Sequence, residues 1–188
     1  SGSSAPGEAE NSHRALPRRR LLRSSAIMST PRIFIDGHAG TTGLRIREWL
    51  SERSDLEIWT LEESERKSEP ARRKAIAEAD MTVLCLPDAA AIEAADWARE
   101  SGARMIDASS AHRVAEDWVY GLPELSPGHR NVIANAQFVS NPGCYPSIFV
   151  PLIRPLVDVG ILASDAPLSI HGLSGYSGGG KALIERWE

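Results

Sequence analysis

The sequence has few cysteines, no long apolar run and no excess of positive charge, and each absence removes a class of protein. Its two cysteines, Cys85 and Cys144, lie far apart in the 188 residues, which gives no disulfide framework and fits a reducing cytoplasm. The apolar runs are too short to cross a membrane. The net charge of −4 carries no overall nucleic-acid footprint. We therefore expect a cytoplasmic protein without membrane or nucleic-acid partners.

Metal-ligand spacing is missing as well. The five histidines are scattered, and no pair has the spacing of a helical or finger-type zinc site, so the sequence predicts no metal. What is present is a globular composition, 42% hydrophobic and 24% charged. The length suits one domain, or one domain plus part of another.

Residues 1–30 differ in composition from the rest of the chain. They are rich in Ser, Ala, Pro and Arg, and cannot bury enough apolar surface to fold alone. We interpret them as a disordered leader or tag, because Met28 stands just before the first expected strand. An organelle transit sequence and an arm for an anionic partner are the alternatives.

A glycine-rich turn follows the first apolar strand. Residues 32–36 are predicted to form a buried strand, residues 44–50 an amphipathic helix and residues 56–61 a second strand. Between the first two lies GHAGTTG, from Gly37 to Gly43. Strand, turn, helix and strand together give the context in which a glycine triplet predicts a dinucleotide site.

Each glycine of the triplet has a physical task. Gly37 allows a sharp turn out of the strand, Gly40 allows close approach to a pyrophosphate, and Gly43 allows the helix to pack on the sheet. Thr41 and Thr42 complete the predicted phosphate turn. The alternative is an ordinary strand-to-helix turn that happens to be rich in glycine.

The ribose end of the cofactor is expected near the end of the second strand. An acidic side chain there favours a free 2′-hydroxyl, and a cation or hydroxyl favours a 2′-phosphate. Glu62 and Glu63 offer the first, whereas Ser64 and Arg66 offer the second. Charge alone leaves NAD and NADP open, and a solvated loop is the simplest alternative.

The middle of the chain alternates strands with helices. Asp88 is the expected N-cap of one helix and Gly102 its C-cap. Cys85 reads as a packed strand cysteine. The alternation predicts a Rossmann-like, doubly wound parallel α/β sheet, whose ligands sit at the carboxyl ends of the strands. The expected elements are helices at 71–79 and 89–101 and strands at 81–86, 104–107 and 131–135.

A polar loop leaves the strand at 104–107. The run DASSAHR, from Asp107 to Arg113, gathers an acid, two hydroxyls, an imidazole and a guanidinium. It suits a phosphate or carboxylate, with Ser109 and Arg113 as contacts. Capping of a short helix by Ser109 or Ser110 is an equal alternative.

The strongest candidate for chemistry is Cys144, in the run SNPGCYP from Ser140 to Pro146. A tight turn and an expected helix at 147–159 place the thiol at a helix start, where N–H groups and the helix dipole favour the nucleophilic thiolate. Pro151 and Pro155 are expected to break or kink that helix. The alternative is a small buried hydrophobe.

The chain closes with an expected strand at 168–171 and a Gly/Ser loop at 172–181. The loop is either a flexible linker or backbone lining a ligand cleft, with Lys181 as a cation for a phosphoryl group. A helix begins after it.

Together these motifs resemble N-acetyl-γ-glutamyl-phosphate reductase, in particular its shorter subtype. The matching runs are GHAGTTG, LCLPDAAA from Leu84, DASSAHR, YGLPEL from Tyr120, SNPGCYP and SGYSGGGK from Ser174. The resemblance implies an NADP-dependent enzyme of arginine biosynthesis that reductively dephosphorylates an acyl phosphate and is a homo-oligomer when complete. It implies Cys144 as the nucleophile, and Asp107, Ser109 and Arg113 as a substrate-side motif.

The family chain is longer than this one, and the resemblance places its substrate domain and a catalytic histidine largely past residue 188. We do not give His171 that role. The expected organisation is a leader (1–30), a dinucleotide-binding domain (31–143) and the beginning of an α+β catalytic and dimerisation domain (144–188). Related acyl-phosphate reductases, acting on aspartyl or aminoadipyl substrates, and a non-catalytic nucleotide-binding fragment are the alternatives.

Overall fold

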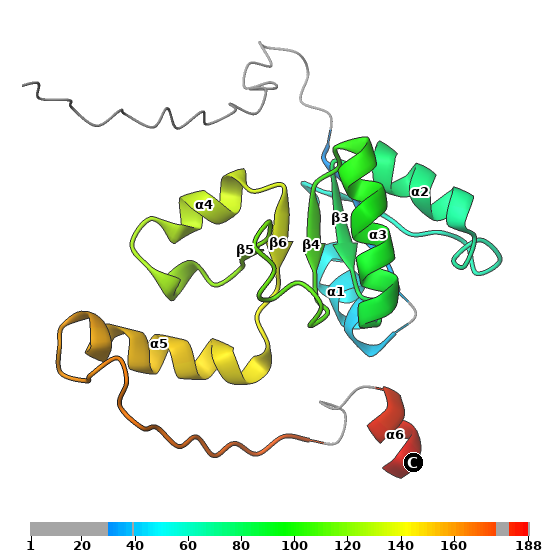
Figure 1. The fold of residues 1–188 in the computed structure, drawn as a ribbon. Coiled ribbons are helices and arrows are strands. Elements are labelled where there is room, and N and C mark those ends of the chain that lie inside the picture. Colours follow the sequence, from blue (N-terminus) through cyan, green and yellow to red (C-terminus); the bar gives the residue numbers. More distant parts are fainter. Residues whose placement is uncertain (1–29, 39, 176–180, 188) are drawn as a thin grey trace, which may run out of the picture.

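The computed structural model describes residues 30–38, 40–175 and 181–187, and the leader expected over residues 1–30 lies almost entirely outside them. A six-stranded sheet in the order β2-β1-β3-β4-β6-β5 forms the centre of the molecule (Figure 1). All five pairings are parallel. The strands are β1 (Arg32–Asp36), β2 (Glu57–Trp59), β3 (Met81–Leu84), β4 (Met105–Asp107), β5 (Val119–Tyr120) and β6 (Phe138–Ser140). The helices are α1 (Thr41–Ser51), α2 (Glu69–Glu78), α3 (Asp88–Ser101), α4 (His129–Asn135), α5 (Cys144–Asp158) and α6 (Lys181–Trp187), with a 3₁₀ turn, η1, at Pro123–Leu125.

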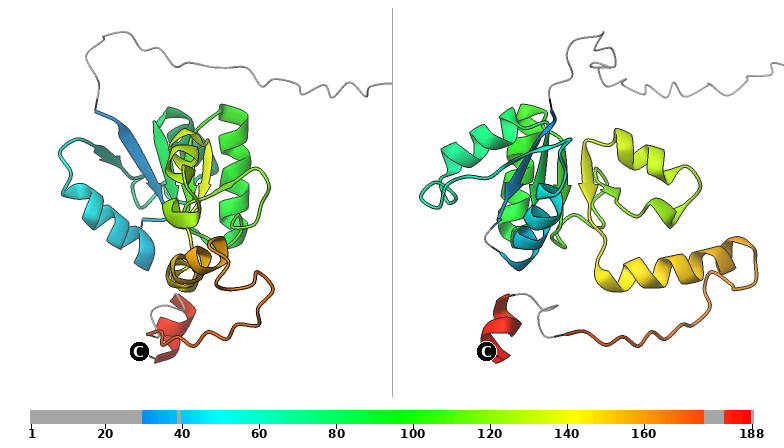
Figure 2. Two further views of the ribbon diagram at one scale, coloured as in Figure 1. Left: turned by 90° about the vertical axis from the view of Figure 1, so that its left-hand side faces the viewer. Right: turned by 180° about the vertical axis from the view of Figure 1, so that it is seen from behind.

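Helices lie on both faces of the sheet, as the predicted doubly wound fold requires. Figure 2 shows α1 on one face and α3 on the other. The face of α3 that meets the sheet is a row of fully buried alanines, which lets helix and strands approach closely. These are Ala91, Ala94, Ala95 and Ala98. Together with Phe34, Ile76 and Met105 they form the core, and the fold class is confirmed.

The strand register places four residues in one row at the carboxyl edge of the sheet. Asp36 lies opposite Leu84, Leu84 opposite Asp107, and Asp107 opposite Ser140. Three of the four are polar, and all four are buried. Because connections leave parallel strands at this edge, the glycine turn, the DASSAHR loop and the cysteine turn all start from one row.

One predicted strand is a helix. Residues 131–135 belong to α4, and the strand comes three residues later, as β6. The side chain of Arg104 donates hydrogen bonds to the carbonyl oxygens of Ala134 and Ala136, at 2.9 and 3.2 Å. A guanidinium at a helix C-terminus stabilises it, and this cation comes from the residue just before β4, about thirty residues earlier.

Three further expectations needed correction. Residues 168–171 form no strand, since an extended segment needs a ladder partner and these described residues have none. Pro87 occupies the N-cap position of α3, and Asp88 is its first residue; Gly102 is the C-cap, as predicted. Pro151 and Pro155 do not break α5, which runs continuously from Cys144 to Asp158.

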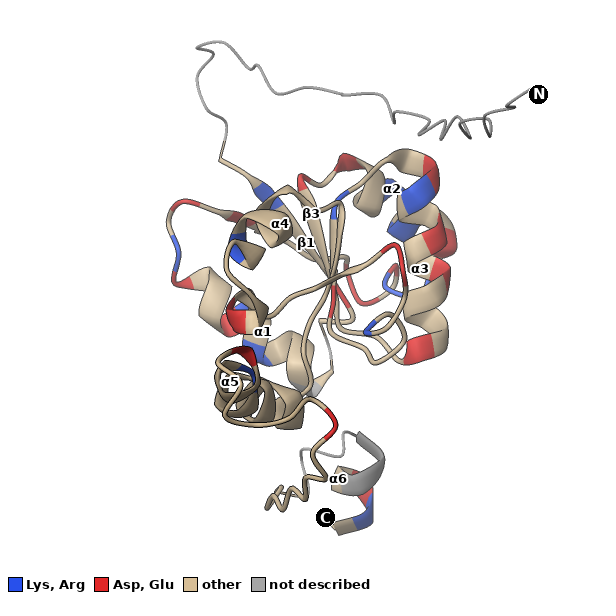
Figure 3. Cartoon of the chain, turned by 60° about the vertical axis from the view of Figure 1, so that its left-hand side comes forward, with Lys and Arg blue, Asp and Glu red and all other residues tan. Residues whose placement is uncertain are grey.

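The last part of the described chain exposes apolar side chains. Figure 3 shows few charged residues along α5. Ile148 and Leu152 are 66% and 65% exposed, and Leu173 is fully exposed. Among the residues that the structure describes, no helix is long and apolar enough to cross a membrane.

Candidate active site at the carboxyl edge of the sheet

The glycine turn after β1 is sterically specified at its two ends. Gly37 has a φ of +87°, and a Cβ built there would lie 2.3 Å from the carbonyl oxygen of Cys85. A Cβ on Gly43 would lie 2.4 Å from the oxygen of Gly37. The sharp turn predicted at Gly37 is therefore confirmed. At Gly43 the close contact is between α1 and the glycine turn itself, and the packing on the sheet predicted for this glycine stays a prediction.

Gly40 is different, because no atom of the described residues comes close enough to require a glycine there. Its φ is −83°, and a Cβ would meet its nearest neighbour only at 3.5 Å. It is the N-cap of α1 and makes no side-chain cap, so the first N–H groups of the helix have no partner inside it. A glycine with room to spare at an uncapped helix start fits a site where a phosphate approaches the backbone. The side chain of Thr41 lies outside the described part of the structure.

The segment expected to meet the ribose is a turn between β2 and α2. Ser64 is exposed, and the guanidinium of Arg66 donates to the carboxylate of Glu63. The backbone N–H of Arg66 donates to the oxygen of Glu62 at 3.0 Å. Glu63 and Arg66, the acid and the base of this turn, thus pair with each other. The cofactor contacts assigned to Ser64 and Arg66 stay predictions.

Cys144 is the first residue of α5 and is exposed, as the sequence predicted for a reactive thiol. The first backbone bond of the helix runs from Ser147 to the oxygen of Gly143, at 3.1 Å. The N–H groups of Cys144 and Tyr145 therefore have no partner within the helix, and Pro146 has no N–H. Two backbone donors stand free at the residue that carries the thiol.

Arg113 reaches the cysteine turn from the loop that follows β4. Its Nε donates to the oxygen of Asn141 at 3.2 Å. A Cβ on Gly143 would lie 3.0 Å from the Nη1 atom of Arg113, so the guanidinium covers the N-cap of α5. The backbone N–H of Asn141 in turn donates to the oxygen of Asp107 at 2.7 Å. The fold thus brings together the guanidinium and the thiol that the sequence singled out separately.

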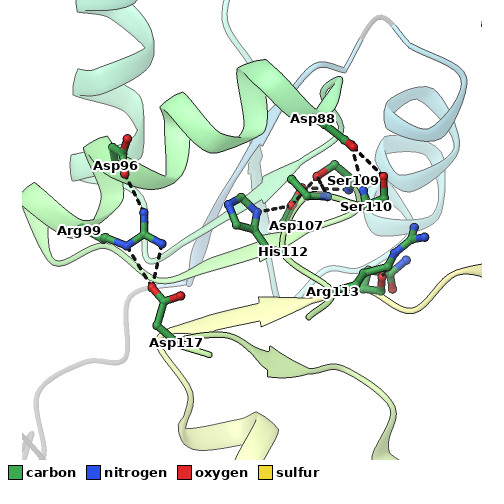
Figure 4. Close-up of polar contacts among 11 residues, drawn as sticks. Asp88, Asp96, Arg99, Asp107, Ser109, Ser110, His112, Arg113 and Asp117 are labelled. Carbon is green, nitrogen blue, oxygen red and sulfur yellow. Dashed lines mark hydrogen bonds and ion pairs between the residues drawn. The ribbon is translucent and has the colours of Figure 1, made fainter. Parts of the chain in front are cut away.

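Ser109 is buried, and its hydroxyl faces inward. Its Oγ donates to the carboxylate of Asp107 at 2.6 Å and accepts from the N–H of Ala111 at 3.2 Å. Ser110 is exposed and bonds to Asp88 instead (Figure 4). Neither hydroxyl caps a helix, since residues 110–114 form turns. Ser109 therefore shapes the loop around Asp107, and its contact with substrate stays a prediction.

Two hollows adjoin the candidate site. One, of about 430 Å³, is lined by Thr42 of the glycine turn, by Ala108 after β4 and by Asn141 of the cysteine turn. The other, of about 660 Å³ and mostly apolar, has Cys144 and Tyr145 at its rim and residues 168–175 as its second wall. The glycine turn and the cysteine turn thus open onto one space, and the thiol opens onto another.

Cys85 lies just after β3 and is partly buried. Burial, with added repulsion from the carboxylates of Asp107 and Asp36, raises the pKa of its thiol to about 12. A thiol that stays protonated at neutral pH is inert, which agrees with the packed role predicted for it.

Sequence reasoning missed the buried ion pair beside the glycine turn. Arg72 of α2 donates to Asp36 at 3.0 Å, stacks over Trp97 at 4.7 Å, and is only 10% exposed at its side chain. Burial raises the pKa of Asp36, and Arg72 opposes that effect. Asp36, an acid at the end of a strand, could be recognised in the sequence, but its partner Arg72 lies 36 residues away.

The two predictions made for the end of the chain, the Gly/Ser loop and Lys181, are not tested by the structure. The side chain of Lys181 and residues 176–180 of the Gly/Ser loop lie outside the described part of the structure.

Within the described ranges, no three His, Cys, Asp or Glu side chains gather as a metal site needs.

Known proteins resemble the chain in sequence and in fold. Residues 60–135 match the NAD-binding domain of semialdehyde dehydrogenases. The chain is 53% identical over 161 residues to the N-acetyl-gamma-glutamyl-phosphate reductase of Trichormus variabilis, a match that covers 86% of this chain and 50% of the relative. The chain thus spans about half the length of the curated relatives it matches.

Solved structures agree on the fold. The aspartate semialdehyde dehydrogenase II of Vibrio cholerae, complexed with ASA, matches with a TM-score of 0.61 at 19% identity, over 84% of this chain and 50% of that one. The Candida albicans aspartate semialdehyde dehydrogenase, solved with NADP, matches with a TM-score of 0.52 at 19% identity, over 70% and 48%. The chain therefore contains an NAD-binding domain of the semialdehyde dehydrogenase type and is homologous to N-acetyl-gamma-glutamyl-phosphate reductases over about half of their length.

Proposed function

We propose that the chain is the cofactor-binding and thiol-bearing half of an NADP-dependent reductase that converts N-acetyl-γ-glutamyl phosphate to N-acetylglutamate semialdehyde, a step of arginine biosynthesis. The observation that carries the proposal is the meeting of Arg113 with the cysteine turn at the start of α5. The 53% identity to reductases of this name favours their substrate over an aspartyl or aminoadipyl phosphate.

The cofactor site consists of the glycine turn and the start of α1. Gly37 and Gly43 shape the turn, Gly40 leaves room over the helix N-terminus, and Thr42 faces the hollow shared with Asn141. Ser64 and Arg66 are the proposed contacts of a 2′-phosphate. The cofactor, when bound, supplies the hydride that reduces an acyl carbon.

Cys144 performs the group transfer. Its thiolate attacks the acyl carbon, the bond from carbon to phosphate oxygen breaks, and phosphate leaves with that electron pair. The product is a thioester on Cys144. After hydride addition, the carbon–sulfur bond breaks, the aldehyde forms and the thiolate returns.

The start of α5 and Arg113 stabilise charge in these steps. The free N–H groups of Cys144 and Tyr145 are placed to donate to an oxyanion at the reacting carbon. The guanidinium of Arg113, over the N-cap, suits the leaving phosphate as a charge-assisted donor. Lys181 is proposed as a second phosphate cation. The substrate side continues into the proposed second domain, which begins at residue 144 and which in the complete protein carries the oligomer contacts.

The test is phosphate-dependent reduction of NADP by the complete protein, with N-acetylglutamate semialdehyde as the second substrate. Cys144→Ala should abolish turnover, whereas Cys85→Ala, the matched control, should retain it. Unchanged turnover in Cys144→Ala would refute the proposed thioester mechanism. NADP binding by the complete protein without any turnover would favour the alternative, a non-catalytic nucleotide-binding role.

A further inference from the structure

The loop after β4 is folded around one buried carboxylate. The side chain of Asp107 is fully buried. Its Oδ1 accepts the backbone N–H of Ser109 at 2.9 Å, and its Oδ2 accepts the hydroxyl of Ser109 at 2.6 Å. The same Oδ2 lies 2.6 Å from Nδ1 of His112. Figure 4 shows Ser109 and His112 converging on this carboxylate, from within one short loop. Because a carboxylate only accepts, Nδ1 of His112 carries the hydrogen.

The imidazole is also fixed on its face. The ring of His112 is 5% exposed and stacks on Trp118, with centroids 4.0 Å apart and planes 11° apart. Trp118 stacks in turn on Phe138 of β6, at 5.0 Å. The ring therefore has one position, set by a hydrogen bond at its edge and by aromatic contact on its face.

A second anchor holds the outer side of the loop. Asp88, the first residue of α3, accepts the backbone N–H of Ser110 at 3.0 Å and its hydroxyl at 2.7 Å. These two bonds lower the pKa of Asp88, so the acceptor is an ionised carboxylate at neutral pH. The loop is thus bound from inside by Asp107 and from outside by Asp88.

The anchored loop places Arg113 next to the start of α5. This residue directly follows His112, and its guanidinium lies against Asn141 and Gly143, one residue before the thiol of Cys144. The guanidinium makes one described hydrogen bond, at 3.2 Å, packs on a glycine, and is attracted by the carboxylate of Asp88, which itself holds the loop. Its place at the thiol therefore depends on the backbone that carries it.

We propose that His112 is a positioning residue. By donating to Asp107 it holds the 108–113 loop so that the cation of Arg113 stands at the start of α5, where it meets the phosphoryl group of the substrate. The identity of that anion rests on the proposed function. The placement of the cation does not, and it can be measured without turnover.

The test compares two alkylating reagents at Cys144 in the 188-residue chain. Iodoacetate is an anion and iodoacetamide is neutral, so the ratio of their rates reports positive charge beside the thiol. A cation about 6 Å away raises that ratio about threefold at low ionic strength, and salt removes the effect. Peptide mass spectrometry gives the rate at Cys144 separately from Cys85. Arg113→Met should lower the ratio by that factor.

Two variants separate the roles of the imidazole. His112→Phe keeps a ring against Trp118 but cannot donate to Asp107, and it should lower the ratio to the Arg113→Met value. His112→Asn keeps a donor near the Nδ1 position without the stack, and it should retain the wild-type ratio. His129→Phe is the matched control, since it removes a histidine whose Nε2 contacts the oxygen of Tyr120 at 2.7 Å, outside the loop.

The outcomes decide between positioning and general stability. A wild-type ratio in His112→Phe, with a lowered ratio in Arg113→Met, would overturn the proposal. So would a lowered ratio in a folded His112→Asn or in His129→Phe. An unchanged ratio in Arg113→Met would show that the cation does not act at the thiol. Should His112→Phe fail to fold, His112→Leu takes its place, because leucine also cannot donate to Asp107. If Cys144→Ala turned over while the ratios behaved as expected, the proposed function would fail and the positioning would stand.

Discussion

Replacing Gly37 by alanine tests whether the glycine turn is built as the structure shows. A φ of +87° costs an alanine about 1–2 kcal/mol. Its Cβ would also lie 2.3 Å from the carbonyl oxygen of Cys85, where ordinary contact begins at 3.4 Å. Relief requires movement of the end of β3, where Cys85 donates to the oxygen of Asp36 at 2.8 Å. Overpacking adds about 1–3 kcal/mol. The expected loss is about 2–5 kcal/mol, a large part of the stability of a domain.

Gly102→Ala is the matched control for backbone strain alone. Gly102 has a φ of +73° with nothing within 4 Å of a built Cβ, so it should lose only about 1–2 kcal/mol. Urea unfolding followed by circular dichroism measures both variants against the parent chain. The difference between them isolates the collision with Cys85. Equal losses in Gly37→Ala and Gly102→Ala would refute the steric account of this turn.

Three further predictions concern the same edge of the sheet. Gly40→Ala should change the unfolding free energy by less than about 1 kcal/mol, because the added Cβ has room. The same variant should bind NADP at least about tenfold more weakly in titration calorimetry, and an unchanged affinity would contradict a phosphate at this turn. Iodoacetamide at neutral pH should label Cys144 before Cys85, whose rate should rise about tenfold per pH unit up to a pH of about 12; the reverse order of labelling would refute the inert role of Cys85. Arg72→Met should cost about 3–5 kcal/mol by leaving Asp36 without its cation, and Asp36→Asn in the same chain should recover most of it in thermal melts. Removing Arg72 moves the pKa of Asp36 further up, so Arg72→Met should be most stable below pH ~4 and lose stability as the pH rises through that raised pKa, whereas a flat pH profile would argue against a buried carboxylate.

The elements that the sequence predicted correctly are those whose causes are local. Gly43 is required by contact with the turn just before it, Gly37 takes a positive φ in that same turn, and the helix start at Cys144 follows from the turn before it. The buried strands around them are short apolar runs with hydrogen-bonding partners in one sheet. Spacing and residue type are enough to predict such elements.

The missed features depend on partners far along the chain. Helix α4 replaces a predicted strand because Arg104 binds its last carbonyl groups. Asp88 has the residue type of an N-cap, yet its carboxylate binds Ser110, 22 residues later. The stack of His112 on Trp118 likewise requires the loop to be folded first. None of these pairings has a period or a fixed spacing that a sequence pattern could reveal.

The start of α5 is held at the carboxyl edge of the sheet by hydrogen bonds of Asn141. Asn141 is bonded to the oxygen of Asp107 at 2.7 Å and receives Arg113 at its own carbonyl. The thiol at residue 144 is therefore held by the same row of strand ends that carries the glycine turn. Further along α5, Ile148 and Leu152 stand about two-thirds exposed and have no such tie to the sheet. The positions of the thiol of Cys144, of Arg113 and of the glycine turn are thus set within the described chain. A substrate-side domain, as proposed above, would add its contacts at the apolar outer part of α5.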